Sequence, residues 1–130
     1  MTADEWTVQR HLAAASPDAI ALYERFIALA AQCGPFRYRV TKTSITLKGT
    51  RRGFAGTLPR RGPLRGYLDL TRQVSDPRIL SSAPYTRRLY VHQFRVRALD
   101  ELDGQFAGWL AEAYAVGQGA HLKDPPAAAR

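Results

Sequence analysis

The sequence has very little cysteine and no long apolar stretch. Cys33 is the single cysteine among 130 residues, so an internal disulfide is excluded and a buried thiol is the favoured interpretation. No run of about 18 apolar residues occurs, as a membrane-spanning helix would need. The beginning of the sequence, MTADEWTVQR, is too acidic and polar for a signal peptide. We therefore expect a soluble, cytoplasmic protein without a membrane partner.

Residue sets that mark catalytic, metal and cofactor sites are also missing. The three histidines, His11, His92 and His121, are scattered and show none of the spacings that zinc sites use. Neither a glycine-rich phosphate-binding loop nor a G-x-S-x-G nucleophile motif occurs. A metal-dependent nuclease would need clustered carboxylates, and residues 35–98 contain only Asp69 and Asp76. The sequence thus predicts no metal, no cofactor and no catalytic residue, which is typical of a binding module.

Acidic residues are scarce in the middle of the chain, where Lys and Arg are abundant. Residues 35–98 hold fifteen Lys and Arg against two acids, whereas the flanking segments 1–34 and 99–130 are mildly acidic. The whole chain carries a net charge of +8. Positive charge that is confined to one part of the chain predicts a local positive surface. Genomic composition is an alternative source of the high arginine content.

Two amphipathic helices are predicted from their start and stop signals. The first helix has Ser16 as its N-cap, Pro17 at its first position, and Gly34 after its last turn. The second helix follows Asp100 and Asp103, which both stand in capping positions, and stops at Gly117. Each carries one apolar stripe that needs a core to pack against.

Between these helices the apolar residues recur at every second position, which is typical of strands. We predict five strands at residues 36–40, 45–48, 54–58, 64–70 and 89–97, joined mainly by short hairpin links rich in Gly, Pro and Arg. Residues 73–88 hold two prolines and three serines, and we interpret them as a long connection.

The order helix, five strands, helix predicts an α+β fold with both helices on one face of a mainly antiparallel sheet. Residues 1–119 would form a single domain, and residues 120–130 a flexible tail. The opposite face of the sheet would expose the alternate strand positions. These positions are basic or polar, and they are the candidate binding residues: Arg37, Arg39, Lys48, Arg65, Tyr67, Gln93, Arg95 and Arg97.

Four segments occur in an order that resembles a known bacterial family. They are SPDAIALYERFIALAAQCGP, KTSITLKGTRRGFAG, YVHQFRV and LDELDGQFAGWLAEAYAVGQ, and the resemblance spans roughly residues 5–119. The family is a domain of unknown function that is found as a small stand-alone protein. It is also a module in proteins labelled as predicted transport or restriction-associated. The resemblance implies a compact α+β unit and supplies no catalytic residues to transfer to this chain. Because the family also occurs in restriction-associated proteins, the resemblance favours nucleic acid as the ligand.

The basic face supports two binding hypotheses. In the first, the cations bind nucleic acid through its phosphates with low sequence specificity. In the second, the same face or a sheet edge binds an acidic protein or a second copy of the chain, because arginine suits such interfaces.

His92 supports a third and weaker hypothesis, an enzyme or small-anion binder. This residue lies mid-strand on the apolar side, between Tyr90 and Phe94. A cleft with Tyr85 under the long connection would give it a chemical role. A core histidine that hydrogen-bonds to backbone is the favoured interpretation.

Overall fold

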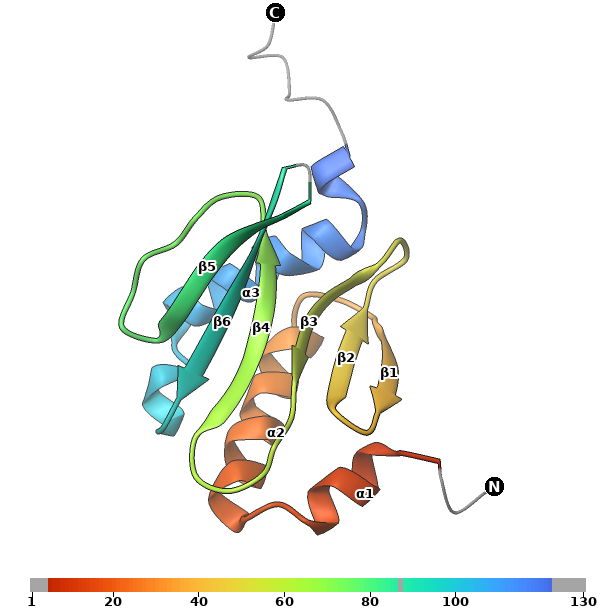
Figure 1. The fold of residues 1–130 in the computed structure, drawn as a ribbon, viewed down its shortest axis with the longest axis vertical. Coiled ribbons are helices and arrows are strands. Elements are labelled where there is room, and N and C mark those ends of the chain that lie inside the picture. Colours follow the sequence, from red (N-terminus) through yellow and green to blue (C-terminus); the bar gives the residue numbers. More distant parts are fainter. Residues whose placement is uncertain (1–4, 87, 123–130) are drawn as a thin grey trace, which may run out of the picture.

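The computed structural model describes residues 5–86 and 88–122, and Figure 1 shows its helices and strands. The elements follow in this order along the chain: α1 (Val8–Ala13), α2 (Pro17–Ala31), β1 (Arg37–Thr41), β2 (Ser44–Lys48), β3 (Gly53–Thr57), β4 (Leu64–Leu70), β5 (Ile79–Thr86), β6 (Leu89–Val96), the 3₁₀ turn η1 (Leu99–Glu101), α3 (Gly104–Gly117) and the 3₁₀ turn η2 (Ala120–Leu122). The fold is therefore α+β, as predicted.

The two main helices begin where their capping residues predicted. The Ser16 hydroxyl accepts a hydrogen bond from the Ala19 N–H at 3.2 Å, and Pro17 opens α2. The Asp103 carboxylate caps α3 by accepting from the Phe106 N–H at 3.0 Å. Asp100 lies one turn earlier, in η1. The chain leaves α2 through Gly34, whose φ of 142° is one that glycine adopts without strain.

All strand pairs are antiparallel, and the sheet has the order β1-β2-β3-β4-β6-β5. The five predicted strands are present, with no end shifted by more than one residue. The prediction of a long connection over residues 73–88 is wrong, because Ile79–Thr86 form a sixth strand, β5, at the outer edge beside β6. The chain passes from β4 over β6 to this edge and then returns in a hairpin.

An edge position explains why β5 is hard to recognise from sequence. It bonds to one neighbour only, so Pro84 can lack its N–H there without breaking a second ladder. Register shifts occur between Ile79 and Ser81 and between Pro84 and Thr86. Most of the strand is exposed, and the apolar alternation that marks a half-buried strand is therefore absent.

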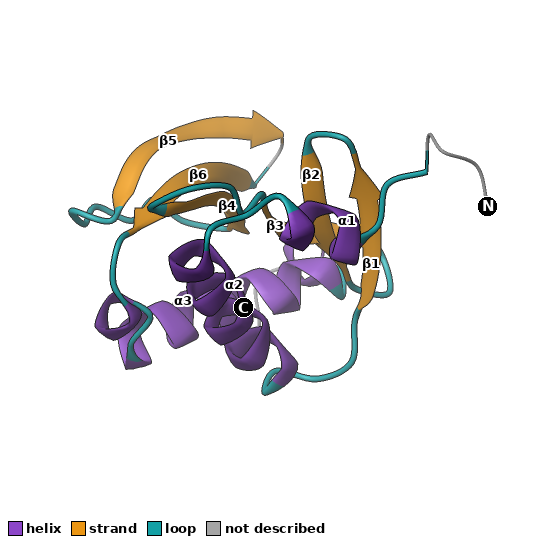
Figure 2. Cartoon of the chain, turned by 90° about the horizontal axis from the view of Figure 1, so that it is seen from below, coloured by secondary structure: helices purple, strands orange, loops and turns teal. Residues whose placement is uncertain are grey.

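Helices α2 and α3 lie on the same face of the sheet, as Figure 2 shows. The core fills the space between these two layers. Phe26 from α2, Phe94 from β6 and Phe106 from α3 are fully buried, with ring centroids 5.2–6.3 Å apart. Leu68 of β4 is buried in the same cluster. The sheet therefore buries one face against the helices and leaves the other open.

Both ends of the described chain add small contacts. In α1, the His11 ring nitrogen Nε2 lies 2.7 Å from the Thr41 carbonyl oxygen of β1, and the Trp6 ring stacks on His11. At the other end, His121 is buried within η2. Residues 123–130 of the predicted tail lie outside the described residues, so a flexible tail there stays a prediction.

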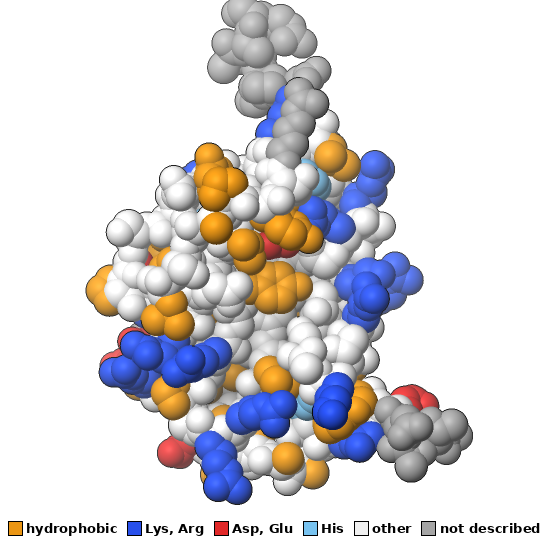
Figure 3. Space-filling view, viewed as in Figure 1, with side chains coloured by type: hydrophobic (Ala, Val, Ile, Leu, Met, Phe, Trp, Pro, Cys, Tyr) orange, Lys and Arg blue, Asp and Glu red, His pale blue; other side chains and the backbone are white. Residues whose placement is uncertain are grey.

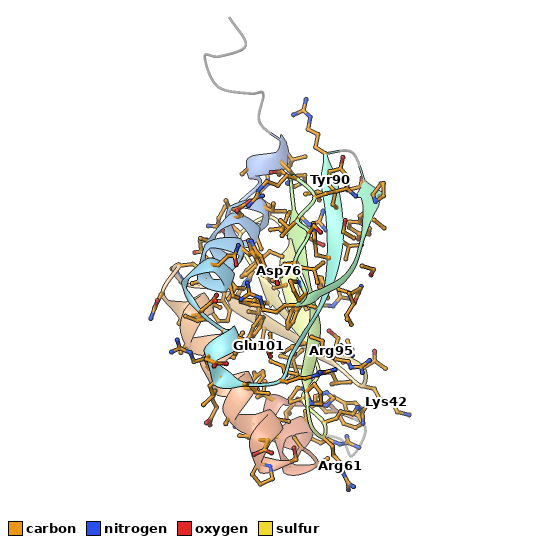
Figure 4. All side chains as sticks on the ribbon, turned by 90° about the vertical axis from the view of Figure 1, so that its left-hand side faces the viewer. Lys42, Arg61, Asp76, Tyr90, Arg95 and Glu101 are labelled. Carbon is orange, nitrogen blue, oxygen red and sulfur yellow. The ribbon has the colours of Figure 1, made fainter. Side chains whose placement is uncertain are left out.

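Arg78 fixes the connection that leads into β5. Its guanidinium bonds to Asp76 at 2.8 and 3.1 Å, to Asp103 at 2.9 Å and to the Glu101 carbonyl oxygen at 2.7 Å. It also lies 4.7 Å from the centroid of the Trp109 ring. Asp76 and Glu101 are labelled in Figure 4, which views the helical layer and the sheet from the side. The connection is thereby tied to the start of α3.

Candidate functional site

The open face of the sheet is hollowed into a trough. Figure 2 shows β1 and β2 standing at a steep angle to β4 and β6, with β5 on the far side, and Figure 3 looks into the hollow between them. Its volume is about 540 Å³, within the usual range of small-ligand sites. All six strands and the β2–β3 link contribute to the lining: Arg39, Thr41, Thr46, Lys48, Arg52, Gly53, Tyr67, Asp69, Tyr85, Val91 and Gln93.

A row of residues in register crosses this trough. Arg39 lies opposite Thr46, and Thr46 lies opposite Gly56. Gly56 in turn lies opposite Tyr67, which lies opposite Gln93. Because directly opposite residues share a face, the row runs across the sheet from β1 to β6. Arg39, Tyr67 and Gln93, which the sequence assigned to the open face, are thus brought into one site.

Gly56 in β3 lets the Tyr67 ring lie close to the sheet backbone at the bottom of the trough. A Cβ atom added to Gly56 would lie 2.4 Å from Cε1 of Tyr67, so the tyrosine ring rests directly on the β3 backbone. Burial of that ring raises the pKa of the Tyr67 phenol, and a hydrogen bond with Thr46 partly offsets the effect. The result is a flat, half-buried aromatic floor.

The predicted basic residues lie on the open face, but only some of them line the hollow. Arg39 and Lys48 line it, and Arg37 lies opposite Lys48. Arg65 lies opposite Arg95 farther along β4 and β6. Figure 3 shows Lys and Arg side chains on several sides of the hollow, and Figure 4 labels Arg95 on the sheet side of the molecule.

Arg97 lies apart from these cations. It follows the last residue of β6, and its backbone N–H donates to the Glu101 carboxylate in the turn before α3. Its side chain is exposed and does not line the hollow. The structure therefore separates Arg97 from the rest of the predicted set.

Three arginines of the described chain form ion pairs with acidic side chains. Arg78 pairs with Asp76 and Asp103, Arg72 pairs with Glu112, and Arg52 pairs with Asp69. Among residues 5–86 and 88–122, no salt bridge involves a second group, the open-face cations Arg37, Arg39, Lys48, Arg65 and Arg95. These five cations therefore have no acidic partner within the part of the chain that the structure describes.

An Arg52–Asp69 pair at the edge of the hollow was not foreseen as part of the site. Nη2 of Arg52 lies 3.0 Å from Oδ2 of Asp69, and Nε of Arg52 donates to the Gly53 carbonyl at 3.0 Å. Asp69 is only 2% exposed, and its other oxygen, Oδ1, is buried without a hydrogen-bond partner. Burial raises the pKa of the Asp69 carboxyl to about 6, and the Arg52 guanidinium only partly offsets this.

Tyr85 of β5 lines the side of the hollow opposite β1 and β2. Its side chain is 59% exposed, and the ring centroid lies 5.4 Å from Cζ of Arg52. This spacing is within the range of a cation–π contact. Of the two residues that the third hypothesis joined in one cleft, Tyr85 lines this hollow and His92 does not.

His92 lies on the helix-facing side of β6, opposite the buried Leu68. The Val74 N–H donates to Nε2 at 2.9 Å, so Nε2 is an acceptor and the ring proton resides on Nδ1. Nδ1 lies 3.1 Å from the Tyr90 carbonyl oxygen, to which it donates. Burial lowers the pKa of the imidazole, which favours this neutral form. The geometry is that of a core histidine with both nitrogens engaged.

The part of the chain that the structure describes has neither a metal-binding cluster nor a membrane-spanning helix. No group of three or more His, Cys, Asp or Glu side chains is placed to hold a metal ion there. No helix of those residues has the length and apolar character needed to cross a membrane.

Comparison with known proteins gives a match to a family model. The model, described as Domain of unknown function (DUF5655), matches residues 8–117, from the first residue of α1 to the last of α3. No curated protein and no solved structure matches the chain.

Proposed function

The chain belongs to DUF5655, the family of unknown function that its sequence resembles, and from that premise we propose that it binds nucleic acid through the open face of its sheet. The five open-face cations contact backbone phosphates, and the trough holds the strand. Phosphate contacts carry little sequence information, so this binding has low specificity.

The observation that carries the proposal is the placement of like charges directly opposite each other. Arg37 faces Lys48 across β1 and β2, and Arg65 faces Arg95 across β4 and β6. Directly opposed like charges destabilise a sheet by a few tenths to about 1 kcal/mol. An anion that bridges such a pair turns this repulsion into attraction. Repeated phosphates spaced along a strand supply several bridging anions at once.

The shape of the face favours a single strand over a duplex. Tyr67 and Tyr85 present two aromatic rings within the trough, and bases of a single strand can stack on such rings. The bases of a duplex are already stacked and paired. Two rings are a small stacking surface, however, so phosphate contacts dominate the affinity.

The test is fluorescence anisotropy with labelled single-stranded DNA, single-stranded RNA and duplex DNA over a range of salt concentrations. We expect single strands to bind more tightly, with log K falling by about 0.7 per phosphate contact for each unit of log salt. Binding that is absent up to about 100 μM protein, the weak end of non-specific affinity, would contradict the proposal.

A matched pair of double variants locates the surface. Arg39→Gln with Lys48→Gln removes two cations from the trough, and we expect the salt slope to fall by about 1.4. Arg25→Gln with Arg72→Gln removes the same charge elsewhere, from α2 and from the partner of Glu112 on α3. Equal losses of affinity in both variants would mean that net charge, not this face, drives binding.

A protein partner is the second candidate, and the β5 edge favours it. Leu80 is 46% exposed on this edge strand, where backbone groups face outward. Light scattering after size exclusion measures self-association. A dimer that Leu80→Lys disperses, in a protein that does not bind nucleic acid, would replace the first proposal with this one.

A further inference from the structure

Asp69 is the acidic residue in a hollow otherwise lined by basic, polar and aromatic side chains together with Gly53 and Val91. Its Oδ2 oxygen is used by Arg52, while Oδ1 is buried and lacks a donor. A buried carboxylate oxygen without a partner is costly, and such groups in folded proteins call for an explanation. An N–H group on a ligand would supply the missing donor.

The surroundings of this oxygen restrict what kind of ligand fits. Tyr67 and Tyr85 offer flat aromatic surfaces in the same hollow, and Arg39 and Lys48 offer positive charge at its other side. The ligand should therefore combine a hydrogen-bond donor, a planar ring and a negative group. A nucleotide within a strand has all three.

We propose that the hollow holds one unpaired base of the bound strand and that Asp69 Oδ1 accepts a hydrogen bond from its amino group. This inference rests on the proposed nucleic-acid function and adds a base preference to it. Cytosine, adenine and guanine carry an exocyclic amino group, whereas thymine and uracil do not. The expected preference is therefore for amino-bearing bases over thymine or uracil.

The negative charge of Asp69 determines which bases the hollow prefers. Thymine presents carbonyl oxygens on both sides of its single N–H, and these oxygens are repelled by the Asp69 carboxylate. The amino group of cytosine donates to a carboxylate in the way that acidic side chains read this base. One such contact gives roughly tenfold discrimination, from the range for a specific base contact.

Entry of a base into the hollow would involve Tyr85 of β5, which lines it together with Asp69. Tyr85 is exposed on this edge strand, and its contact with Arg52 is a cation–π contact at 5.4 Å. Weak contacts of this kind exchange readily. A base that enters beside Tyr85 takes the place of this contact, with its ring against the tyrosine and its amino group toward Asp69.

The Asp69→Asn variant should invert the preference. The Arg52 Nη2 donor needs an acceptor at the Oδ2 position, so the asparagine carbonyl oxygen turns toward Arg52. Its NH₂ group then takes the Oδ1 position. The pocket thereby changes from an acceptor to a donor, which suits a thymine carbonyl and not a cytosine amino group. The positive charges of the trough stay in place.

The experiment measures anisotropy with oligo(dC) and oligo(dT) of equal length at one salt concentration. Wild type should bind oligo(dC) about tenfold more tightly, and Asp69→Asn should bind oligo(dT) more tightly with an unchanged salt slope. An oligonucleotide of pyrimidin-2-one, which is cytosine without its amino group, should lose the wild-type advantage of oligo(dC). This third probe needs no variant, so it decides even where Asp69→Asn fails to fold.

The outcomes separate the two levels of the proposal. Salt-dependent binding with equal affinity for oligo(dC), oligo(dT) and the pyrimidin-2-one strand overturns the base pocket and leaves the nucleic-acid function intact. Tighter binding of oligo(dT) by wild type overturns the base pocket as well. No binding to any strand overturns both.

Discussion

Arg65 of β4 and Arg95 of β6 lie directly opposite each other on the open face of the sheet. No salt bridge among the described residues involves either side chain. A pair of cations in this position opposes folding and favours an anion. Stability and binding should therefore respond in opposite directions when one of the two charges is removed.

Arg95→Gln should stabilise the fold and weaken nucleic-acid binding. We expect the free energy of unfolding to rise by a few tenths to about 1 kcal/mol. The salt slope for a single strand should fall by about 0.7, because one phosphate contact is lost. Urea unfolding and anisotropy measure the two effects. Arg25→Gln, on the helical layer, is the control for binding and should leave the salt slope unchanged, whereas a loss of stability in Arg95→Gln would refute the repulsion argument.

Gly56→Ala should disturb the floor of the trough. The new Cβ atom would lie 2.4 Å from Cε1 of Tyr67, so the ring must move. We expect a destabilisation of about 1–3 kcal/mol, the usual cost of overpacking. Gly108→Ala in α3 is the matched control, since nothing lies within 4 Å of its Cβ position. That variant should gain about 0.5–1 kcal/mol from helix propensity. Equal stability of both variants in thermal unfolding would mean that Tyr67 does not rest on β3.

Asp69 should make the fold less stable as the pH rises from about 4 to 6. Burial raises the carboxyl pKa from 3.8 to about 6 in the folded state, so the folded protein binds more protons than the unfolded chain in this interval. Stability then falls with increasing pH. The groups that interact with the carboxylate are Arg52, which opposes the shift, and the phenol of Tyr67.

Comparison with Asp69→Asn isolates this contribution. The variant lacks the ionisation, so between pH 4 and 7 the difference in free energy of unfolding should move in favour of Asp69→Asn by as much as about 3 kcal/mol. Urea unfolding at several pH values measures it. Parallel pH profiles for the two proteins would show that the pKa of the Asp69 carboxyl is not raised in the folded state.

His92→Ala should affect stability and not binding. The substitution leaves the Val74 N–H without its acceptor and opens a cavity beside Leu68. We expect a loss of about 2–4 kcal/mol. Affinity for single strands should stay unchanged where the variant is folded, since His92 lies on the opposite face from the trough. A stable variant with greatly weakened binding would instead give this histidine a functional role.

The capping residues and the two-residue alternation were sufficient to predict most of the fold. Ser16 and Asp103 mark helix starts through local hydrogen bonds, and Gly34 marks a helix end through its backbone freedom, none of which needs knowledge of distant contacts. In the strands, burial of every second side chain leaves its mark directly in the sequence. An exposed edge strand such as β5 shows no such alternation, and its proline and two serines are typical of a loop.

The site was predicted only in outline. Alternation placed Arg39, Lys48 and Tyr67 on the open face, but the trough results from the angle between β1–β2 and β4–β6, which arises from the whole sheet. The Arg52–Asp69 pair joins a hairpin link to a strand 17 residues away. A register shift also occurs between Leu47 and Lys48 in the strand before this link, and no local sequence signal predicts it. Tyr85 was considered only as a cleft partner of His92, because β5 was not recognised as a strand.

The strand order has a consequence for the protein as it leaves the ribosome. β5 precedes β6 in the chain, yet β6 is its sole neighbour in the sheet. When synthesis has reached Thr86, the residues of β5 therefore have no partner strand. Translation must continue through Val96 before the ladder between them can form. A nascent chain halted within this hairpin would hold the first four strands beside an unpaired segment, and we expect that segment to be open to proteases until β6 emerges.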